Sequence, residues 1–146
     1  MKYATVIAFG VLMLTSFRSE ETGSLVVSLS NIKKTGKIHL ALYKKCEDFP
    51  DSKFIVKSLK NECSGSCSFQ FESVPYGEYA IAIYQDVNSN EKLDTGMFGI
   101  PSEPFAFSNN FRPKFGGPSF EKCRFEFSKD KQEVQIQMIN SLFGGD

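Results

Sequence analysis

Residues 77–84 read GEYAIAIY, and this stretch decides the fold class of the chain. Tyr79, Ile81 and Ile83 alternate with Ala80, Ala82 and Tyr84. Successive side chains of a β-strand point to opposite faces, so both faces of this segment are apolar. The pattern predicts a strand in the middle of a sheet, covered on both sides.

The same period of two recurs outward from this stretch in both directions. It appears in residues 25–30, 37–42, 54–56, 67–72, 124–127 and 134–138. No stretch after residue 19 shows a helical period. About seven short strands separated by turn residues predict an all-β, antiparallel two-sheet sandwich of immunoglobulin-like or transthyretin-like type.

Residues 96–118 break the alternation with four Gly, four Pro and five Phe. So many Phe residues argue against disorder, and we expect an ordered loop packed over one end or face of the sandwich. One interpretation makes its aromatic part a ligand surface; the other has the rings close the open end of the sandwich. The residues of the possible ligand surface are Phe105, Phe107, Ser108, Asn109 and Phe111.

The N-terminal residues 1–19 have the pattern of a secretory signal peptide. Lys2 precedes an almost continuous apolar run over residues 3–14, and polar residues follow. The run is shorter than the roughly 20 residues that span a bilayer, although an N-terminal membrane anchor is the competing interpretation. We expect a secreted or periplasmic protein with one β-sandwich domain over residues 20–146 and no transmembrane span after processing.

The charge of the chain bears on its partners. The 146 residues carry a formal net charge of zero, and the Lys and Arg residues form no basic stripe. Nucleic acid is therefore not the expected partner. We expect an envelope or extracellular partner.

Four cysteines follow the N-terminal run: Cys46, Cys63, Cys67 and Cys123. An even number in an exported chain predicts disulfides. Ser-Gly-Ser between Cys63 and Cys67 is flexible enough for these two to pair, which would leave Cys46 and Cys123 as a long-range pair. A zinc site is the weaker alternative, because the spacing is Cys-x-x-x-Cys and the chain has one His.

Residues 86–94, DVNSNEKLD, resemble a calcium-binding loop in their spacing. Side-chain oxygens fall at positions one, three, five and nine, and the main-chain carbonyl of position seven adds another. These positions are Asp86, Asn88, Asn90, Asp94 and, through its carbonyl, Lys92. Position six is Glu91 instead of Gly and position twelve is Met97 instead of Glu, so we expect Glu103 to complete the shell. The other interpretation is an ordinary Asn/Asp-rich turn.

Enzymatic alternatives rest on fewer residues. Acidic pairs such as Asp86 with Glu103, or Asp94, are candidates for hydrolysis of a glycan or peptide. His39 is the one histidine, and we expect it on the solvent face of a strand. No Gly-rich phosphate loop and no Gly-x-Ser-x-Gly elbow occur.

The block from residue 77 to 127 resembles a bacterial exported family, domain of unknown function 2141. The motifs that carry the resemblance, in order, are Gly-x-Tyr-Ala, Asp-x-Asn-x-Asn, Gly-Ile-Pro-x-Glu, Phe-Ser-Asn-Asn and Phe-Gly-x-Pro-x-Phe. The likeness extends more loosely over residues 24–140, and Cys63 and Cys67 are not part of it. It implies a signal peptide and a small β domain without an established activity. The site residues that it covers are Asp86, Asn88, Asn90, Asp94, Glu103, Ser108 and Asn109.

A second, shorter likeness lies at the Pro-Tyr-Gly-Glu-Tyr turn of residues 75–79. This turn is similar to the Pro-x-Gly-x-Tyr entry of transthyretin-like and collagen-adhesin B-type domains, which is an analogy of fold alone. Together these observations predict an exported binding or structural module, with its long loop held by calcium and disulfides. The alternative function is a small hydrolase that uses the acidic residues of the same loop.

Overall fold

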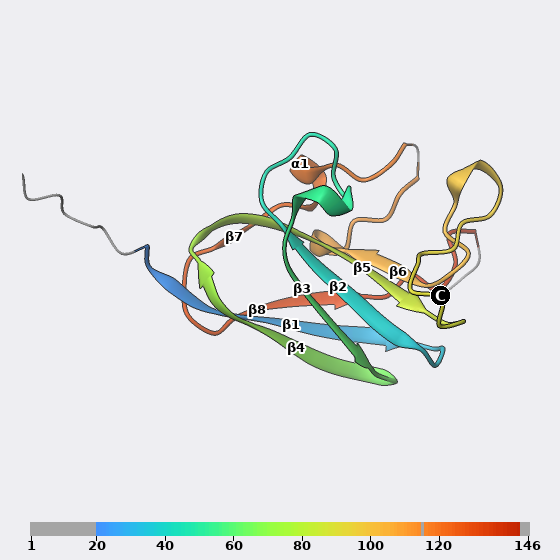
Figure 1. The fold of residues 1–146 in the computed structure, drawn as a ribbon, viewed down its shortest axis with the longest axis horizontal. Coiled ribbons are helices and arrows are strands. Elements are labelled where there is room, and N and C mark those ends of the chain that lie inside the picture. The colour runs from blue at the N-terminus through green and yellow to red at the C-terminus, as the bar shows by residue number, and fades with distance from the viewer. Residues whose placement is uncertain (1–19, 115, 144–146) are drawn as a thin grey trace, which may run out of the picture.

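The computed structural model describes residues 20–114 and 116–143, so the predicted signal peptide lies outside the described residues. Eight strands form two sheets that pack face to face (Figure 1). This confirms the all-β sandwich. Within the described part of the chain, no helix is long and apolar enough to cross a membrane.

The smaller sheet has the order β4-β1-β8. Its strands are β4 (Gly65–Pro75), β1 (Thr22–Ile32) and β8 (Gln132–Gln137). β1 runs antiparallel to β4 but parallel to β8, with Val27 opposite Val134. The expectation of a purely antiparallel sandwich was therefore wrong at one strand pair: the chain crosses to the other sheet and returns, so β8 reaches β1 in the same direction.

The larger sheet has the order β3-β2-β5-β6, and β7 pairs with the start of β5. The bounds are β2 (Lys37–Tyr43), β3 (Ile55–Glu62), β5 (Gly77–Asp86), β6 (Phe105–Phe107) and β7 (Phe125–Phe127). Short helical turns are η1 (Ser52–Phe54), η2 (Met97–Gly99), η3 (Ser108–Asn110) and α1 (Phe120–Cys123). β5 has partners on both sides, as its doubly apolar sequence predicts.

The main core lies between the two sheets. Every second side chain of β5 points into this core. Tyr79, Ile81 and Ile83 are buried there in one cluster with Leu25 and Val27 of β1. Burial of apolar area is the principal favourable term in folding, so these alternating positions hold the sheets together.

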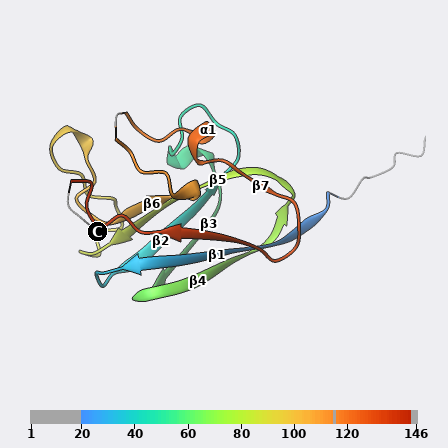
Figure 2. The same cartoon turned by 180° about the vertical axis from the view of Figure 1, so that it is seen from behind.

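A second apolar cluster covers the outer face of the larger sheet. Its buried members are Tyr43, Phe49, Ala80, Phe105, Phe107, Phe120, Cys123 and Ile139. Both ribbon views place residues 44–54 and α1 on the side of this sheet that faces away from β1, β4 and β8 (Figures 1 and 2). Residues 96–118 therefore include a sheet strand, β6, and two helical turns; β6 packs in the second cluster, whereas Met97 and Phe98 of η2 are exposed.

Candidate functional site

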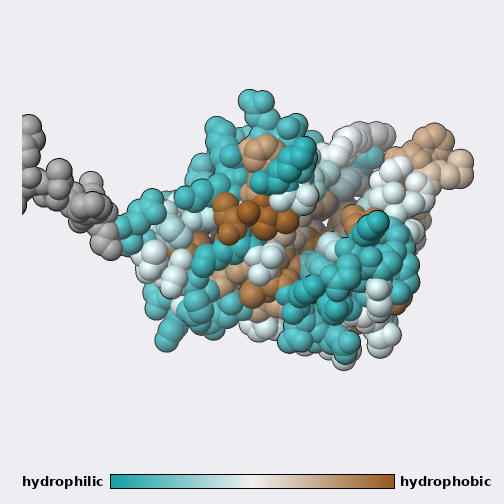
Figure 3. All heavy atoms as spheres, in the orientation of Figure 1, coloured by the Kyte–Doolittle hydropathy of each residue, from teal (hydrophilic) through white to brown (hydrophobic). Residues whose placement is uncertain are grey.

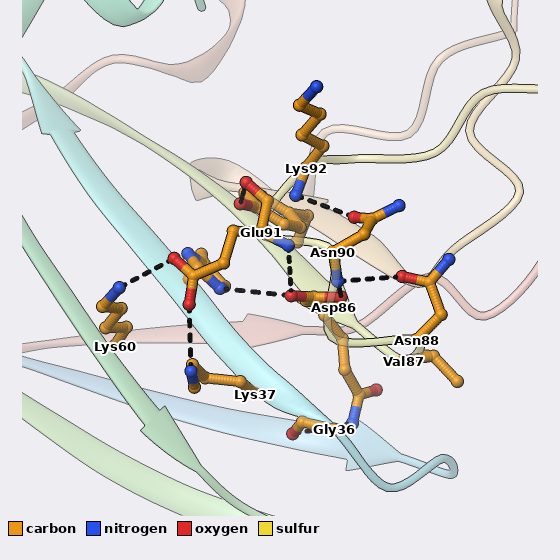
Figure 4. Close-up of polar contacts among 12 residues, drawn as sticks. Gly36, Lys37, Lys60, Asp86, Val87, Asn88, Asn90, Glu91 and Lys92 are labelled. Atoms are coloured by element: carbon orange, nitrogen blue, oxygen red, sulfur yellow. Dashed lines mark hydrogen bonds and ion pairs between the residues drawn. The ribbon is translucent and has the colours of Figure 1, made fainter.

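Asp86 is the last residue of β5 and organises the loop that follows. Its side chain is 1% exposed. One carboxylate oxygen accepts the main-chain N–H of Asn90 at 3.1 Å and the other that of Glu91 at 2.8 Å (Figure 4). Hydrogen bonds to a charged acceptor are the strong ones, so this buried carboxylate bends the chain back over the strand end.

The other predicted ligand side chains converge on Asp94. Its two oxygens accept the side-chain amides of Asn88 at 2.6 Å and Asn90 at 2.9 Å. The side-chain oxygen of Asn88 accepts the N–H of Asn90, and that of Asn90 accepts the N–H of Lys92. The spacing seen in the sequence thus brings these side chains together in space.

Glu103 contacts both ends of the loop. It is buried, and its two oxygens accept the main-chain N–H groups of Val87 at 2.8 Å and Asp94 at 3.0 Å. Both oxygens are therefore occupied at the two ends of the loop. In this structure Glu103 closes the loop, and the sequence spacing gave no sign of that role.

Position six of the loop has a backbone conformation that usually favours Gly. Glu91 has a φ of 62°, in the left-handed region where an EF-hand loop carries its invariant Gly. Its carboxylate lies 2.8 Å from Nζ of Lys60 and 3.0 Å from Nζ of Lys37. Hydrogen bonds from these two amines lower the pKa of Glu91 to about 2, and both ion pairs are exposed to solvent.

His39 is less exposed than expected, with a side-chain exposure of 16%. Its ring stacks on Tyr84 with 4.5 Å between the centroids, and Nε2 lies 3.9 Å from the Asp86 carboxylate. Burial lowers the pKa of His39 below its ordinary value of 6.5, against the opposing attraction of Glu91 and Asp86. The expectation of a solvent-facing His39 was wrong, because Tyr84 covers one side of the ring.

The donor chemistry of the loop fits a calcium ion better than a transition metal. Among residues 20–114 and 116–143, no three His, Cys, Asp or Glu side chains gather closely enough to hold a metal. A cation here would depend on amide and main-chain oxygens beside Asp86 and Asp94. Calcium accepts six to eight such oxygens, whereas zinc takes His and Cys.

A groove of about 570 Å³ lies on the outer face of the larger sheet, beside the second cluster. Figure 3 shows it as a hydrophobic strip in a hollow between hydrophilic parts of the surface. This outer groove is lined by Ala41, Tyr43, Ile55, Lys60, Ala82 and Tyr84, among others. Sequence reasoning missed it as a site, although the doubly apolar run at residues 79–84 was a signal of an apolar outer face.

The residues of the predicted ligand surface are divided between two surroundings. Phe105 and Phe107 line the outer groove and are largely buried in the second cluster. The Ser108 hydroxyl is buried, donates to the carbonyl of Cys123 and accepts the N–H of Ile81. The Asn109 amide donates to the carbonyl of Arg124, while Phe111 packs against Phe107. Ser108 and Asn109 therefore hold the main chain and do not face the groove.

The cysteines form one disulfide, between Cys63 and Cys67 in the β3–β4 connection. The expected second pair is not joined: Cys46 and Cys123 are free thiols. Both pack in the second cluster, and burial raises the pKa of the Cys123 thiol to about 11. Membership of one apolar cluster does not by itself require a bond between two Cys residues.

Among known proteins, the chain matches a family model. No curated protein and no solved structure matches the chain. A family model does match, over residues 27–135, and its description is an uncharacterized protein conserved in bacteria. The matched segment runs from β1 into β8 and includes the Asp86 loop, Glu103 and β6. The chain therefore belongs to the bacterial family DUF2141.

Proposed function

We propose that this chain is an exported, non-enzymatic binding module whose loop over residues 86–103 is held in shape by calcium. The observation that carries the proposal is the convergence of Asn88, Asn90 and Asp94 beside the buried Asp86 carboxylate. Calcium binding would require the two Asn amides to rotate so that their oxygens face Asp94, and the N–H groups of Asn90 and Lys92 would then lose these oxygens as acceptors. With few charged ligands, the affinity belongs in the extracellular range, a Kd of about 10⁻⁴–10⁻³ M.

The positions of the carboxylates favour binding over hydrolysis. All four oxygens of Asp86 and Glu103 accept main-chain N–H groups, and both side chains are buried. A general acid or base must reach the substrate, directly or through one water. Asp86 and Glu103 are therefore poorly placed for acid–base chemistry, and the hydrolase alternative rests on Asp94, whose oxygens accept side-chain amides only.

Export is supported by the N-terminal pattern and by the Cys63–Cys67 disulfide. Disulfides persist in oxidising compartments, which include the bacterial periplasm and the medium. N-terminal sequencing of the protein recovered from the envelope and medium tests this part. Loss of about the first 19 residues supports a signal peptide. An intact N-terminus in a membrane fraction would make residues 1–19 an anchor.

Calorimetric titration with calcium tests the metal site. The purified mature protein should bind one calcium ion, and Asp94→Asn should weaken that binding. Asp130→Asn is the matched control, because the Asp130 carboxylate is also a hydrogen-bond acceptor, here of the Ser24 N–H, but lies in the turn before β8. No heat of binding at millimolar calcium, or equal loss in both variants, would contradict the proposal.

A further inference from the structure

The outer groove owes its shape to small residues in the middle of the larger sheet. Ala41 on β2 lies directly opposite Ala82 on β5, between the pairs His39–Tyr84 and Tyr43–Ala80. The outer face of an antiparallel strand pair is usually polar. Here two methyl groups stand between larger rings, and the result is a hollow with an apolar floor.

The size of the outer groove suits a small molecule. Its volume of about 570 Å³ falls within the range of roughly 300–1,000 Å³ that is typical of ligand sites. Ala41, Ile55 and Ala82 are half-buried, so they remain open to an incoming apolar group.

The one fully charged side chain that lines the described part of the outer groove lies at one end of it. Of the lining residues in the described part of the chain, Lys60 alone carries a full charge at neutral pH. Lys60 on β3 is the strand neighbour of His39 on β2. These two residues lie on the same face as Ala41 and Ala82, two positions further along the strands. An apolar floor with a single cation at its end is complementary to a molecule with an apolar body and one anionic head.

Lys60 is able to change partners. Its Nζ lies 2.8 Å from Glu91, but Glu91 also accepts Nζ of Lys37 at 3.0 Å. If Lys60 turns to another anion, Glu91 keeps a cationic partner. All three side chains are exposed, and exposed ion pairs contribute little to stability, so the exchange costs little.

We propose that the outer groove binds a small amphipathic monocarboxylate. Its alkyl or aryl body lies over Ala41 and Ala82, and its carboxylate pairs with Lys60. The inference deepens the proposed function, since it names a ligand class and a site for the binding module. Leu93 and Pro101 of the loop form part of the groove wall, so the loop and the groove are neighbours.

The test is an NMR titration of the full mature protein with phenylbutanoate, and with phenylbutanol as the uncharged match. We expect saturable shifts of the main-chain amides of Ala41, Ser58 and Ala82 with phenylbutanoate, and weaker binding of phenylbutanol. No saturable shifts, or shifts confined to the other sheet, would overturn the inference. Shifts of the same amides on raising protein concentration alone would assign the groove to a second copy of the chain and also overturn it.

Two variants separate the apolar and charged parts. Ala82→Leu fills the hollow and should weaken phenylbutanoate about tenfold, because the apolar contact area is lost. Lys60→Gln should weaken phenylbutanoate by about threefold to fivefold, the range of an exposed ion pair, and leave phenylbutanol unchanged. Ser68→Leu on β4 and Lys129→Gln in the β7–β8 turn are matched controls and should change neither affinity. Equal affinity for the acid and the alcohol in the wild type would overturn the role of Lys60.

Calcium dependence keeps the two proposals apart. The titration is run once with calcium and once with EGTA. Binding of phenylbutanoate in either buffer supports the groove, whether or not calcium binds the loop. Absence of binding in both overturns the groove and leaves the calcium proposal to its own test.

Discussion

Gly36 packs directly under the main-chain oxygen of Asp86. A Cβ atom at this position would overlap that oxygen and would also lie 3.0 Å from the α-carbon of Val87. Gly36 has a φ of 144°, a conformation that side chains rarely adopt. The turn before β2 and the start of the Asp86 loop therefore depend on a residue without a side chain.

Gly36→Ala is expected to lower the free energy of unfolding by about 2–4 kcal/mol, from backbone strain plus the overlap with Asp86. Gly65→Ala is the matched control, since Gly65 also has a positive φ but has open space where a Cβ would stand. That control should cost about 1 kcal/mol. Urea unfolding measures both, and equal losses would show that the Gly36–Asp86 contact is unimportant.

Glu103→Gln should loosen the loop. The change places an amide where two main-chain N–H groups, of Val87 and Asp94, need an acceptor. A buried donor without a partner costs about 1–3 kcal/mol. Hydrogen exchange at these two amides should accelerate, whereas Glu133→Gln, on an exposed carboxylate that accepts the Ser28 hydroxyl, should leave them unchanged. Unchanged protection in Glu103→Gln would contradict the closing role of Glu103.

His39 should titrate below its ordinary pKa of 6.5 in the folded protein. Because folding lowers the pKa of His39, the unfolded chain binds more protons than the folded chain between the folded pKa and about 6.5. Stability is therefore lost as the pH falls from about 6.5 through the folded pKa. Chemical shifts of this one imidazole give the folded pKa. His39→Gln should remove that part of the pH dependence of unfolding.

The direction of the His39 shift also tests its surroundings. Asp86 and Glu91 attract a proton to the ring, while Lys37, Lys60 and burial oppose it. A measured pKa above 6.5 would mean that the attraction of Glu91 and Asp86 prevails over burial.

Peptide mapping without reductant should recover the Cys63–Cys67 link and two free thiols. The double variant Cys63→Ser/Cys67→Ser should lose about 2 kcal/mol of stability, the modest contribution expected of a short closed loop. Cys46 is half-buried and Cys123 fully buried, so a thiol reagent should modify Cys46 first in the folded protein. A recovered Cys46–Cys123 peptide would contradict the arrangement seen here.

Much of the fold was accessible from local periodicity. Successive side chains of strands such as β1 and β5 point to opposite faces of the sheet. An apolar pattern with a period of two therefore identifies these strands in the sequence. β6 was not predicted because Phe105, Ala106 and Phe107 are all buried, and three residues between Pro104 and Ser108 show no alternation. The parallel pairing of β1 with β8 could not be predicted from the sequence, because periodicity identifies a strand but not the strand beside it.

The site was accessible only in part for a related reason. Spacing within one loop placed Asp86, Asn88, Asn90 and Asp94 together, since nine residues of a tight turn have few ways to fold. Glu103 depends on how a second segment returns to the first, which spacing does not give. The groove depends on the register that sets Ala41 opposite Ala82, and register is a property of the pair.

The central claim, a calcium ion in the Asp86 loop, is tested most directly by thermal unfolding with calcium and with EGTA. A ligand that binds only the folded state stabilises it by mass action, about 1–3 kcal/mol at about 10 mM calcium for the expected affinity. The account predicts a rise of several degrees in Tm for the wild type and Asp130→Asn, and none for Asp86→Asn or Asp94→Asn. Each variant is compared with itself in EGTA, so any intrinsic loss of stability cancels. An unchanged wild-type Tm, or an equal rise in all four proteins, would contradict the account and leave residues 86–94 as a turn held by hydrogen bonds alone.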